Sequence, residues 1–503
     1  MKQISFVAIL LLSLFSLSVN AQTQSREEFV RLQQEMREEF NRTQQQARAD
    51  FVNTHRDIRR QLDSLNQQFV ADLARDWRRF ELTISEPPIR TPISEPPVFD
   101  PETMRQPEPV EIPVVRTLPT PVPTPPPVVV PAPQPPIPIP VEQPVLRTTF
   151  FGTEITVRET PRPNIRLAGI SEREIADYWR ALSNLHTDWL DEVMRLKHTL
   201  HLNDWGMFQL LNNLFSVYFP QGNANERVIF SVFMLNQLGY RARIGRDANE
   251  LFALLAFQQM IYNTTSFRIG NPAVRYFVVN PNHRNLSSIQ TSPMDHGGAE
   301  RQVDMALPFM PRFAHNTNTR ILQGMPFQYN RNLVDFLATY PTVYFPVYAE
   351  AAICEVTWRS IETNIRPIIQ NKSQEDAVNW LLNFVQFAFQ YKIDEENYGF
   401  ERWNFAEKTI ASNYSDCDDR AFLFAQLVHR LLDMPVVLIL YSNIHLATAV
   451  RFDNPNTRGD YITINGQRYL ICDPTFIGAR LGMAMPDLRH VPVQYFRINP
   501  YTR

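Results

Sequence analysis

The chain is poor in cysteine and in glycine. Its 503 residues include only three Cys, which excludes the disulfide-rich scaffold of small secreted proteins. They include 15 Gly against 40 Pro, about 3% against 8% of the chain, whereas average usage is roughly 7% Gly and 5% Pro. Because proline breaks helices and central strands, this excess excludes a single compact domain unless the prolines are gathered in one segment.

A strong net charge and a long apolar run are also missing. The formal net charge is −3, so the composition gives no general affinity for nucleic acid. Beyond the N-terminus no stretch reaches the roughly 18 apolar residues of a membrane-spanning helix, so we expect no transmembrane anchor. Hydrophobic residues make up 44% of the chain, which is enough for a substantial core.

The first 21 residues have the pattern of a secretory signal peptide. A positive Lys2 precedes an apolar run at residues 4–17, and the small residue Ala21 ends the segment. The run is too short to cross the roughly 30 Å hydrocarbon layer of a bilayer. We therefore expect residues 1–21 to be removed, and we expect a bacterial protein that is periplasmic or secreted.

Residues 26–80 divide into five units of eleven residues without Pro or Gly. Two apolar columns lie on one helical stripe: Phe29, Phe40, Phe51, Leu62 and Leu73 in the first, and Met36, Ala47, Ile58, Phe69 and Phe80 in the second. A period of eleven favours a nearly straight helix. Residues 22–86 are thus predicted to be a helical stalk, and we expect a homo-oligomer, such as a coiled coil, through residues 26–80. A solvated helix and a helix lying on a membrane surface remain alternatives.

The prolines are concentrated in one segment. Residues 87–144 hold 22 of the 40, a composition typical of polyproline-type spacers. We therefore predict a disordered Pro-rich linker over residues 87–146, with binding motifs for Pro-reading domains as an alternative. This linker separates the stalk from two further regions, at residues 147–365 and 366–503.

The C-terminal region carries a cysteine, a histidine and an aspartate in a suggestive order. A helix is predicted within residues 415–433 with Cys417 in its first turn, and strands are predicted at 436–441, 446–452 and 468–472. His445 precedes the second of these strands, and Asp473 follows the third. A helix followed by an antiparallel meander would bring the three side chains together.

These residue types fit nucleophilic catalysis. A thiol at a helix N-terminus is stabilised as thiolate by the helix dipole and by unpaired amides. His445 would take up and return the proton, and Asp473 would orient the imidazole. The histidines elsewhere have no metal-ligand spacing and no cofactor motif is present, so we expect neither a metal nor a cofactor.

The motifs SDCDDRA around Cys417, His445 at the start of a strand, and ICDPT ending at Thr475 resemble the transglutaminase-like superfamily, as do the upstream helix and Tyr391. The resemblance covers about residues 376–480 and implies a papain-like α+β fold. It implies Cys417 as nucleophile, His445 as general base and acid, and Asp473 as orienting residue. The chain departs from the family pattern at Ser415, where Gly is usual, and at Leu446-Ala447, where an aromatic residue often stands.

The resemblance implies acyl transfer through a thioester on Cys417. Bacterial members are more often hydrolases, so peptide or amide hydrolysis by a cysteine protease or amidase is the first expectation, and cross-linking by a transglutaminase-type acyltransferase is the second. The substrate would be a protein or a cell-wall peptide. The competing hypothesis is a non-catalytic binding or assembly protein that keeps a transglutaminase-like scaffold, so enzyme activity stays an open question.

Residues 147–365 are predicted to be α+β, with a hypothesis of internal duplication. At an offset of 194 residues, Asn223 stands where Cys417 does and Leu251 where His445 does, which suggests a degenerate copy of the same fold. Two unrelated helix-to-strand units are the alternative. Two smaller questions stay open: a side-chain oxyanion donor, for which Trp403 is a guess beside the Cys417 amide, and a Cys354–Cys472 disulfide.

Overall fold

The computed structural model describes residues 60–82, 93, 95–101, 108–115, 145–159, 164–184, 187–279, 286–442 and 444–498. The predicted signal peptide and the predicted stalk up to residue 59 lie outside the described residues. The chain divides into two compact units, residues 1–67 and 68–503. The fold described below is that of the second unit.

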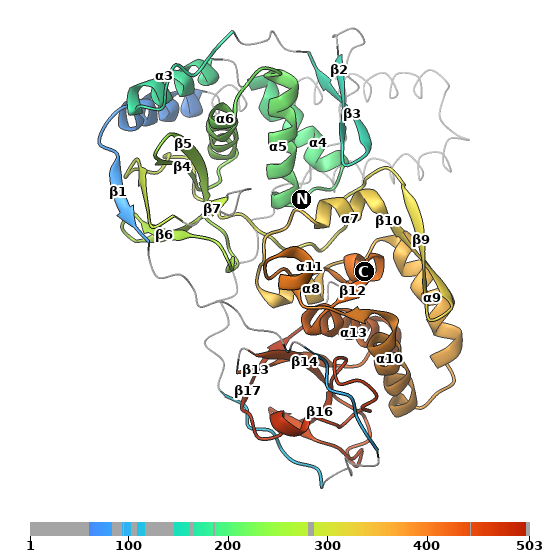
Figure 1. The fold of residues 1–503 in the computed structure, drawn as a ribbon. Helices are drawn as coiled ribbons and strands as arrows, with labels where there is room; N and C mark the ends of the chain where they lie inside the picture. The colour runs from blue at the N-terminus through green and yellow to red at the C-terminus, as the bar shows by residue number, and fades with distance from the viewer. Residues whose placement is uncertain are drawn as a thin grey trace, which may run out of the picture. The chain divides into compact units, whose positions relative to one another are not determined.

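A six-stranded antiparallel sheet organises the first half of this unit (Figure 1). Its strands, in the order β1-β8-β4-β5-β7-β6, are β1 (Arg78–Glu81), β4 (Ala242–Asp247), β5 (Glu250–Leu255), β6 (Ser266–Ile269), β7 (Val274–Val279) and β8 (Ser288–Thr291). The helices of this half are α3 (Glu172–Ser183), α4 (Thr187–Thr199), α5 (Asp204–Tyr218) and α6 (Ala224–Gln237). Two hairpins lie outside the sheet: β2 (Val145–Phe150) with β3 (Thr153–Arg158), and β9 (Thr317–Leu322) with β10 (Met325–Asn330).

A five-stranded antiparallel sheet organises the second half. Its strands, in the order β15-β16-β14-β13-β17, are β13 (Val436–Tyr441), β14 (His445–Val450), β15 (Tyr461–Ile464), β16 (Gln467–Cys472) and β17 (Val493–Arg497). The helices leading to it are α7 (Arg331–Leu337), α8 (Phe345–Glu350), α9 (Glu355–Ile369), α10 (Gln374–Ala388), α11 (Asp394–Tyr398), α12 (Ala406–Ala411) and α13 (Cys417–Leu432). The short strands β11 (Gln390–Tyr391) and β12 (Tyr414–Ser415) pair in parallel, and a 3-10 turn η1 (Pro486–Leu488) precedes β17.

The two sheets have the same strand order. When β4 to β8 are matched in sequence with β13 to β17, the order β8-β4-β5-β7-β6 becomes β17-β13-β14-β16-β15. In each half one helix precedes the first of these strands and packs against the first two, α6 in one case and α13 in the other. Both helices end at a left-handed residue, Gly239 (φ 84°) and Asp433 (φ 54°), which turns the chain into the strand.

The strand registers refine the predicted correspondence between the halves. Glu250 opens β5 opposite the last residue of β4, as His445 opens β14 opposite the last residue of β13. Glu250, one residue before the expected Leu251, therefore stands at the histidine position. The predicted boundary at residues 365/366 falls inside α9, so it does not mark a break in the structure.

Both faces of the second sheet are buried, which explains its apolar strands. Along β13, Val436 and Leu438 belong to the core shared with the helices, whereas Val437 and Ile439 belong to a separate core on the other face. The second core includes Ile112, whose side chain is 0% exposed. A two-sided sheet needs a cover on each face, and α13 covers only one.

Part of the Pro-rich segment provides that cover, contrary to the expectation of an unpacked linker. Val98 forms a parallel bridge with Ile477, and Val114 forms one with Val493 at the start of β17. The backbone N–H of Ile112 also donates to the carbonyl of Tyr461, at 2.8 Å. Figure 1 draws the described segments 95–101 and 108–115 in light blue alongside the red strands of this sheet. The prolines do not prevent this packing, because isolated bridges at a sheet edge need few backbone donors.

The stalk helix ends earlier than its repeat predicts. Residues 60–73 are helical, and the chain then turns into β1. Phe69 packs on Trp179 and His296, with ring centroids 5.1 and 5.3 Å apart, and Leu73 is buried. The last part of the apolar stripe is therefore covered by the globular body of the same chain. The described part of the chain contains no helix with the length and apolar content that a bilayer crossing requires.

Candidate functional site

The thiol of Cys417 lies at the N-terminus of α13. Cys417 is the first residue of the helix, after the N-cap Asp416, and its side chain is buried. The helix begins here because the residues before it are extended, in β12, and an apolar face begins at Ala421. The thiol therefore lies where unpaired helix amides favour negative charge.

His445 opens β14, and Asp473 directly follows the neighbouring strand β16 of the sheet that α13 covers. The distance from His445 Nε2 to Asp473 Oδ2 is 2.8 Å, and both side chains are buried. The other carboxylate oxygen of Asp473 accepts a hydrogen bond from the backbone N–H of Thr475, at 2.9 Å. Both oxygens of the carboxylate are thus engaged, which fixes its orientation toward the ring.

The second ring nitrogen of His445, Nδ1, is available to interact with the thiol. It is buried, and it forms no hydrogen bond of ordinary geometry with any described residue. Burial opposes a charge on this ring, but the Asp473 carboxylate and then the Cys417 thiol outweigh it and raise the pKa of His445 to about 10. Because Asp473 occupies Nε2, Nδ1 is the nitrogen that can exchange a proton with Cys417. The structure thus brings the three predicted residues to one place.

Gln386, on α10, holds the aspartate loop, and sequence reasoning missed it. Its side-chain amide donates to the carbonyls of Asp473, Phe476 and Ala479, at 3.3, 2.7 and 3.0 Å. Its carbonyl oxygen accepts from the backbone N–H of Gly478, at 3.1 Å. A buried glutamine within an apolar helix pattern was the available signal, since such a side chain needs partners.

Ser415, the departure from the family pattern, has a structural partner. Its hydroxyl accepts from Arg420 Nε at 3.0 Å, and the same guanidinium donates to the carbonyl of Phe389 at 2.9 Å. Arg420 also lies over the ring of Tyr391, 5.3 Å from its centroid. The buried Arg420 therefore ties α13 to the β11–β12 pair, with Ser415 as one of its acceptors.

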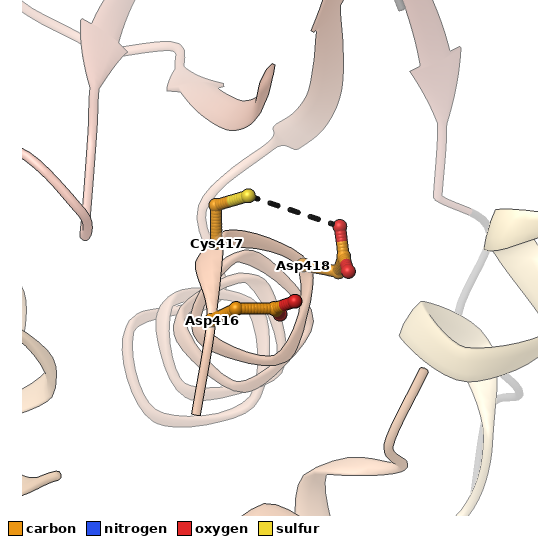
Figure 2. Close-up of side chains that lie close together, drawn as sticks. All are labelled: Asp416, Cys417 and Asp418. Atoms are coloured by element: carbon orange, nitrogen blue, oxygen red, sulfur yellow. Dashed lines mark hydrogen bonds between the residues drawn. The ribbon is translucent and has the colours of Figure 1, made fainter. Parts of the chain in front are cut away.

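Carboxylates surround the thiol on its own helix turn (Figure 2). Asp416 and Asp418 flank Cys417 in the sequence, and Cys417 Sγ lies 4.0 Å from Asp418 Oδ1. Together with Asp394 and Glu401, these two aspartates form a buried group in which one oxygen of each residue lies within 4.8 Å of one oxygen of every other. This group was not recognised in the sequence, because Asp394 opens α11 and Glu401 follows that helix, both distant in sequence from Cys417.

Burial strongly affects the carboxyl groups of this cluster. It raises the pKa of Asp394 to about 10, with Asp419 and Asp418 adding to the effect. It also raises the pKa of Asp416 well above its usual range, again with help from neighbouring carboxylates. The cluster is therefore hard to ionise unless positive charge lies close by.

Asp419 and Trp403, which lie near the nucleophile, have structural partners. Asp419 accepts from the backbone and side-chain N–H groups of Asn404, at 2.8 and 2.7 Å, and does not cap its helix. The indole N–H of Trp403 donates to Glu401 Oε1 at 3.0 Å, so it is directed at the carboxylate cluster. That geometry removes the support for Trp403 as an oxyanion donor and leaves the Cys417 amide.

The two other cysteines are free thiols and do not form a disulfide. Burial raises the pKa of Cys354 to about 12, and Glu407 adds to this effect by accepting a hydrogen bond from its thiol at 2.8 Å. Burial also raises the pKa of Cys472 far above its usual value. Both thiols are thus poor nucleophiles near neutral pH.

The three candidate catalytic side chains are closed to solvent. Cys417 and His445 are 0% exposed and Asp473 is 2% exposed, so a substrate reaches the thiol only after neighbouring groups move. A cavity of about 640 Å³ lies elsewhere, lined by residues that include Met194, Leu202 and Phe309. None of the three catalytic candidates lines it, so it is not their substrate cleft.

Comparison with known proteins gives no assignment. No family model, curated protein or solved structure matches the chain. The functional argument therefore depends on the residues and geometry of the chain itself.

Proposed function

We propose that this protein is a transglutaminase-like cysteine enzyme that transfers acyl groups through a thioester on Cys417. The observation that carries the proposal is the buried His445–Asp473 pair, whose Nε2–Oδ2 distance is 2.8 Å. Nδ1 of the same ring has no other hydrogen-bond partner among the described residues, and the Cys417 thiol contributes to the raised pKa of His445. A buried pair of this kind is costly unless each group has its partner. The order thiol, imidazole, carboxylate is that of the cysteine–histidine catalytic groups.

The reaction follows from these positions. His445 takes the thiol proton, and Cys417 Sγ attacks the carbonyl carbon of an amide. The collapse of the tetrahedral adduct breaks the C–N bond, and His445 returns the proton to the leaving amine. Water then hydrolyses the thioester to a carboxylic acid, with peptide or amide hydrolysis as the net result, whereas an amine acceptor would give a cross-link.

The C-terminal half is proposed as the active copy of a duplicated fold. The identical strand order of the two sheets supports this duplication. In the first half Asn223 caps the helix and the exposed Glu250 opens the second strand, so neither a thiol nor an imidazole is present at those positions. The proposed substrate is a protein or cell-wall peptide outside the cytoplasm, as the signal-like N-terminus suggests.

The second candidate is an inert scaffold that serves binding or assembly. The complete burial of Cys417 and His445 favours it, because a structural core residue is also buried. The two hypotheses differ in the reactivity that they predict for one thiol among three.

The test is labelling of the full chain near neutral pH with a small thiol reagent, followed by peptide mapping. An enzyme should label Cys417 at least tenfold faster than Cys354 or Cys472, and His445→Ala should remove that advantage. Cys417→Ser identifies the labelled position. Equal and slow labelling of all three thiols in the folded protein would overturn the proposal and favour the scaffold.

A further inference from the structure

Residues 110–115 of the Pro-rich segment join the two edges of the second sheet. The edge strands of this sheet are β15 and β17. Glu111 forms a parallel bridge with Tyr461 in β15, and Val114 forms one with Val493 at the start of β17. Four backbone hydrogen bonds accompany the two bridges, with N···O distances between 2.8 and 3.0 Å. The segment therefore binds the sheet as an added strand does, through its main chain.

The side chains of the segment alternate as those of a strand do. Ile112 is completely buried in the core on this face of the sheet, and Val114 packs against the same core. The side chains between and after them are exposed, namely those of Glu111, Pro113 and Val115. Because a strand directs successive side chains to opposite sides, only one side of the segment is recognised by its pocket of aliphatic residues.

An ion pair holds the backbone at the beginning of the segment. Arg489 donates to both carboxylate oxygens of the buried Asp460, at 3.0 and 2.8 Å. The same carboxylate accepts from the backbone N–H of Val110 at 3.0 Å, and the same guanidinium donates to the carbonyl of Glu108 at 2.7 Å. These four contacts do not depend on the side chains of the segment. We call the edges of β15 and β17, together with Asp460 and Arg489, the edge site.

The edge site tolerates proline at defined positions. The segment donates to it through the N–H groups of Val110, Ile112 and Val115, whereas Pro113 contributes its carbonyl. A ligand of this site therefore needs N–H groups at the first, third and sixth positions and aliphatic side chains at the third and fifth. Proline can stand at the second and fourth positions, because no donor is required there.

The chain contains a second segment with this pattern. Residues 137–142 read IPIPVE, against VEIPVV at residues 110–115, and a proline precedes each of them. Ile139 and Val141 stand at the two inward positions, and the two prolines stand where no donor is required. The sixth residue, Glu142, corresponds to an exposed position, where a charged side chain stays in water.

We propose that the edge site is a peptide-binding site for extended aliphatic strands spaced by proline, and that residues 137–142 of a second copy of this chain bind there in exchange for residues 110–115. In its own chain, Glu142 lies three residues before Val145, where β2 begins, a span of about 10 Å at most. β2 is held in the first half, where Asn213 of α5 donates to the carbonyl of Thr149. A second copy is free of that tether to this molecule. The inference is independent of acyl transfer at Cys417.

Peptide binding tests the edge site. A fluorescein-labelled peptide of residues 134–143 should bind the full chain weakly, because residues 110–115 compete from within the molecule at high effective concentration. Ile112→Ala should tighten this binding at least tenfold, since the internal competitor loses its buried side chain. Val115→Pro, which removes a donor and no buried side chain, should act in the same direction. Fluorescence anisotropy gives the dissociation constants.

Two controls define the specificity of that binding. The peptide with Ile139→Asp should not bind, because a carboxylate would enter the aliphatic core. The chain variant Ile321→Ala, at an exposed isoleucine of β9, should leave the affinity for the unmodified peptide unchanged.

A photocrosslink identifies the source of the segment. Position 138 corresponds to Glu111, whose bridge partner is Tyr461 in β15. Ile112→Ala chains that carry Pro138→benzoylphenylalanine are prepared as light and ¹⁵N-labelled copies and refolded as a mixture. Irradiation should give light–heavy products that join position 138 to β15, and mass spectrometry detects them.

Three results would overturn the proposal. They are no binding of the peptide to either Ile112→Ala or Val115→Pro, equal binding of the Ile139→Asp peptide, and crosslinks that are absent or confined to single chains. Thiol labelling of Cys417 is scored separately, so failure of the edge site and failure of the acyl-transfer proposal are distinguishable.

Discussion

The two sheet-and-helix halves of the globular body share a topology and differ in what they bury. In the first half the N-cap Asn223 makes its capping hydrogen bonds and Glu250 is exposed. In the second half Asp416 makes no capping bond, and Cys417 and His445 are completely buried. The same strand order thus forms without a thiol or an imidazole at these two positions and without the acidic cluster. These groups are costly additions that the fold does not need, so their presence is best explained by a function.

The largest expected effect is on the labelling rate of Cys417, and it follows from a change at the histidine position that only the second half has. His445→Ala should slow labelling of Cys417 at least 100-fold, because the thiol loses the base that acts on it. The matched variant Glu250→Ala should leave labelling unchanged. A loss of similar size in both variants would show that the effect is structural. Rates measured by mass spectrometry at a fixed reagent concentration decide between these outcomes.

The next effect concerns the helix before the nucleophile. Gln386→Leu should destabilise the protein by about 3 kcal/mol, because three buried carbonyls lose their donor. The thirteenth residue of α5, which corresponds in helix position to Gln386 in α10, is the exposed Ser216. Ser216→Ala should change stability by less than about 0.5 kcal/mol. Urea unfolding followed by fluorescence gives both values, and equal midpoints would contradict the positioning role.

A buried histidine in the first half, His296, gives a pH effect on stability. Burial lowers the pKa of His296 from 6.5 to about 4, and its Nδ1 accepts from the backbone N–H of Gly298, which requires the neutral ring. The folded pKa lies below the unfolded one, so this contribution is fully present above about pH 6.5 and is lost as the pH falls toward 4. The loss amounts to about 3 kcal/mol.

The variant His296→Phe isolates that contribution. It keeps an aromatic ring against Phe69 and Trp179 and cannot take up a proton. The difference in unfolding free energy between wild type and variant should therefore change between pH 7 and pH 4. A constant difference over this range would contradict the assignment.

The smallest expected effect is the difference in stability cost between removing the N-cap side chain of α6 and removing that of α13. Asn223→Ala should cost about 1 kcal/mol, because the capping bond to the Glu226 amide is lost. Asp416→Ala should lose no capping energy, because Asp416 makes no capping hydrogen bond in α13. Thermal melts of the two variants side by side check the difference.

Local sequence patterns predicted most of the helix and strands that surround Cys417 in the second half. The apolar run at residues 436–441 corresponds to β13 residue for residue, and the pair Asn465-Gly466, which is typical of turns, has left-handed backbone at both positions. The predicted helix and meander bring Cys417, His445 and Asp473 together. Such elements are predictable because their apolar periodicity and turn residues lie within a few positions of one another.

Contacts between distant segments could not be predicted. Nothing local to Ile112 shows that it fills the core of a sheet formed more than 300 residues later. The eleven-residue repeat gives the direction of an apolar stripe but does not show that Phe69 packs on Trp179 of the same chain. The carboxylate cluster likewise joins Asp394 and Asp416 from separate elements.

The β-bridges that Val98 and Val114 form with the second half determine where a stable N-terminally truncated fragment of this chain can begin. A fragment that begins at the predicted seam, residue 147, would lose β1 from the edge of one sheet and the Pro-rich cover from the other. Both sheets would then expose unpaired backbone and apolar side chains, a surface that favours edge-to-edge aggregation. Soluble fragments of the globular body should therefore begin before residue 68.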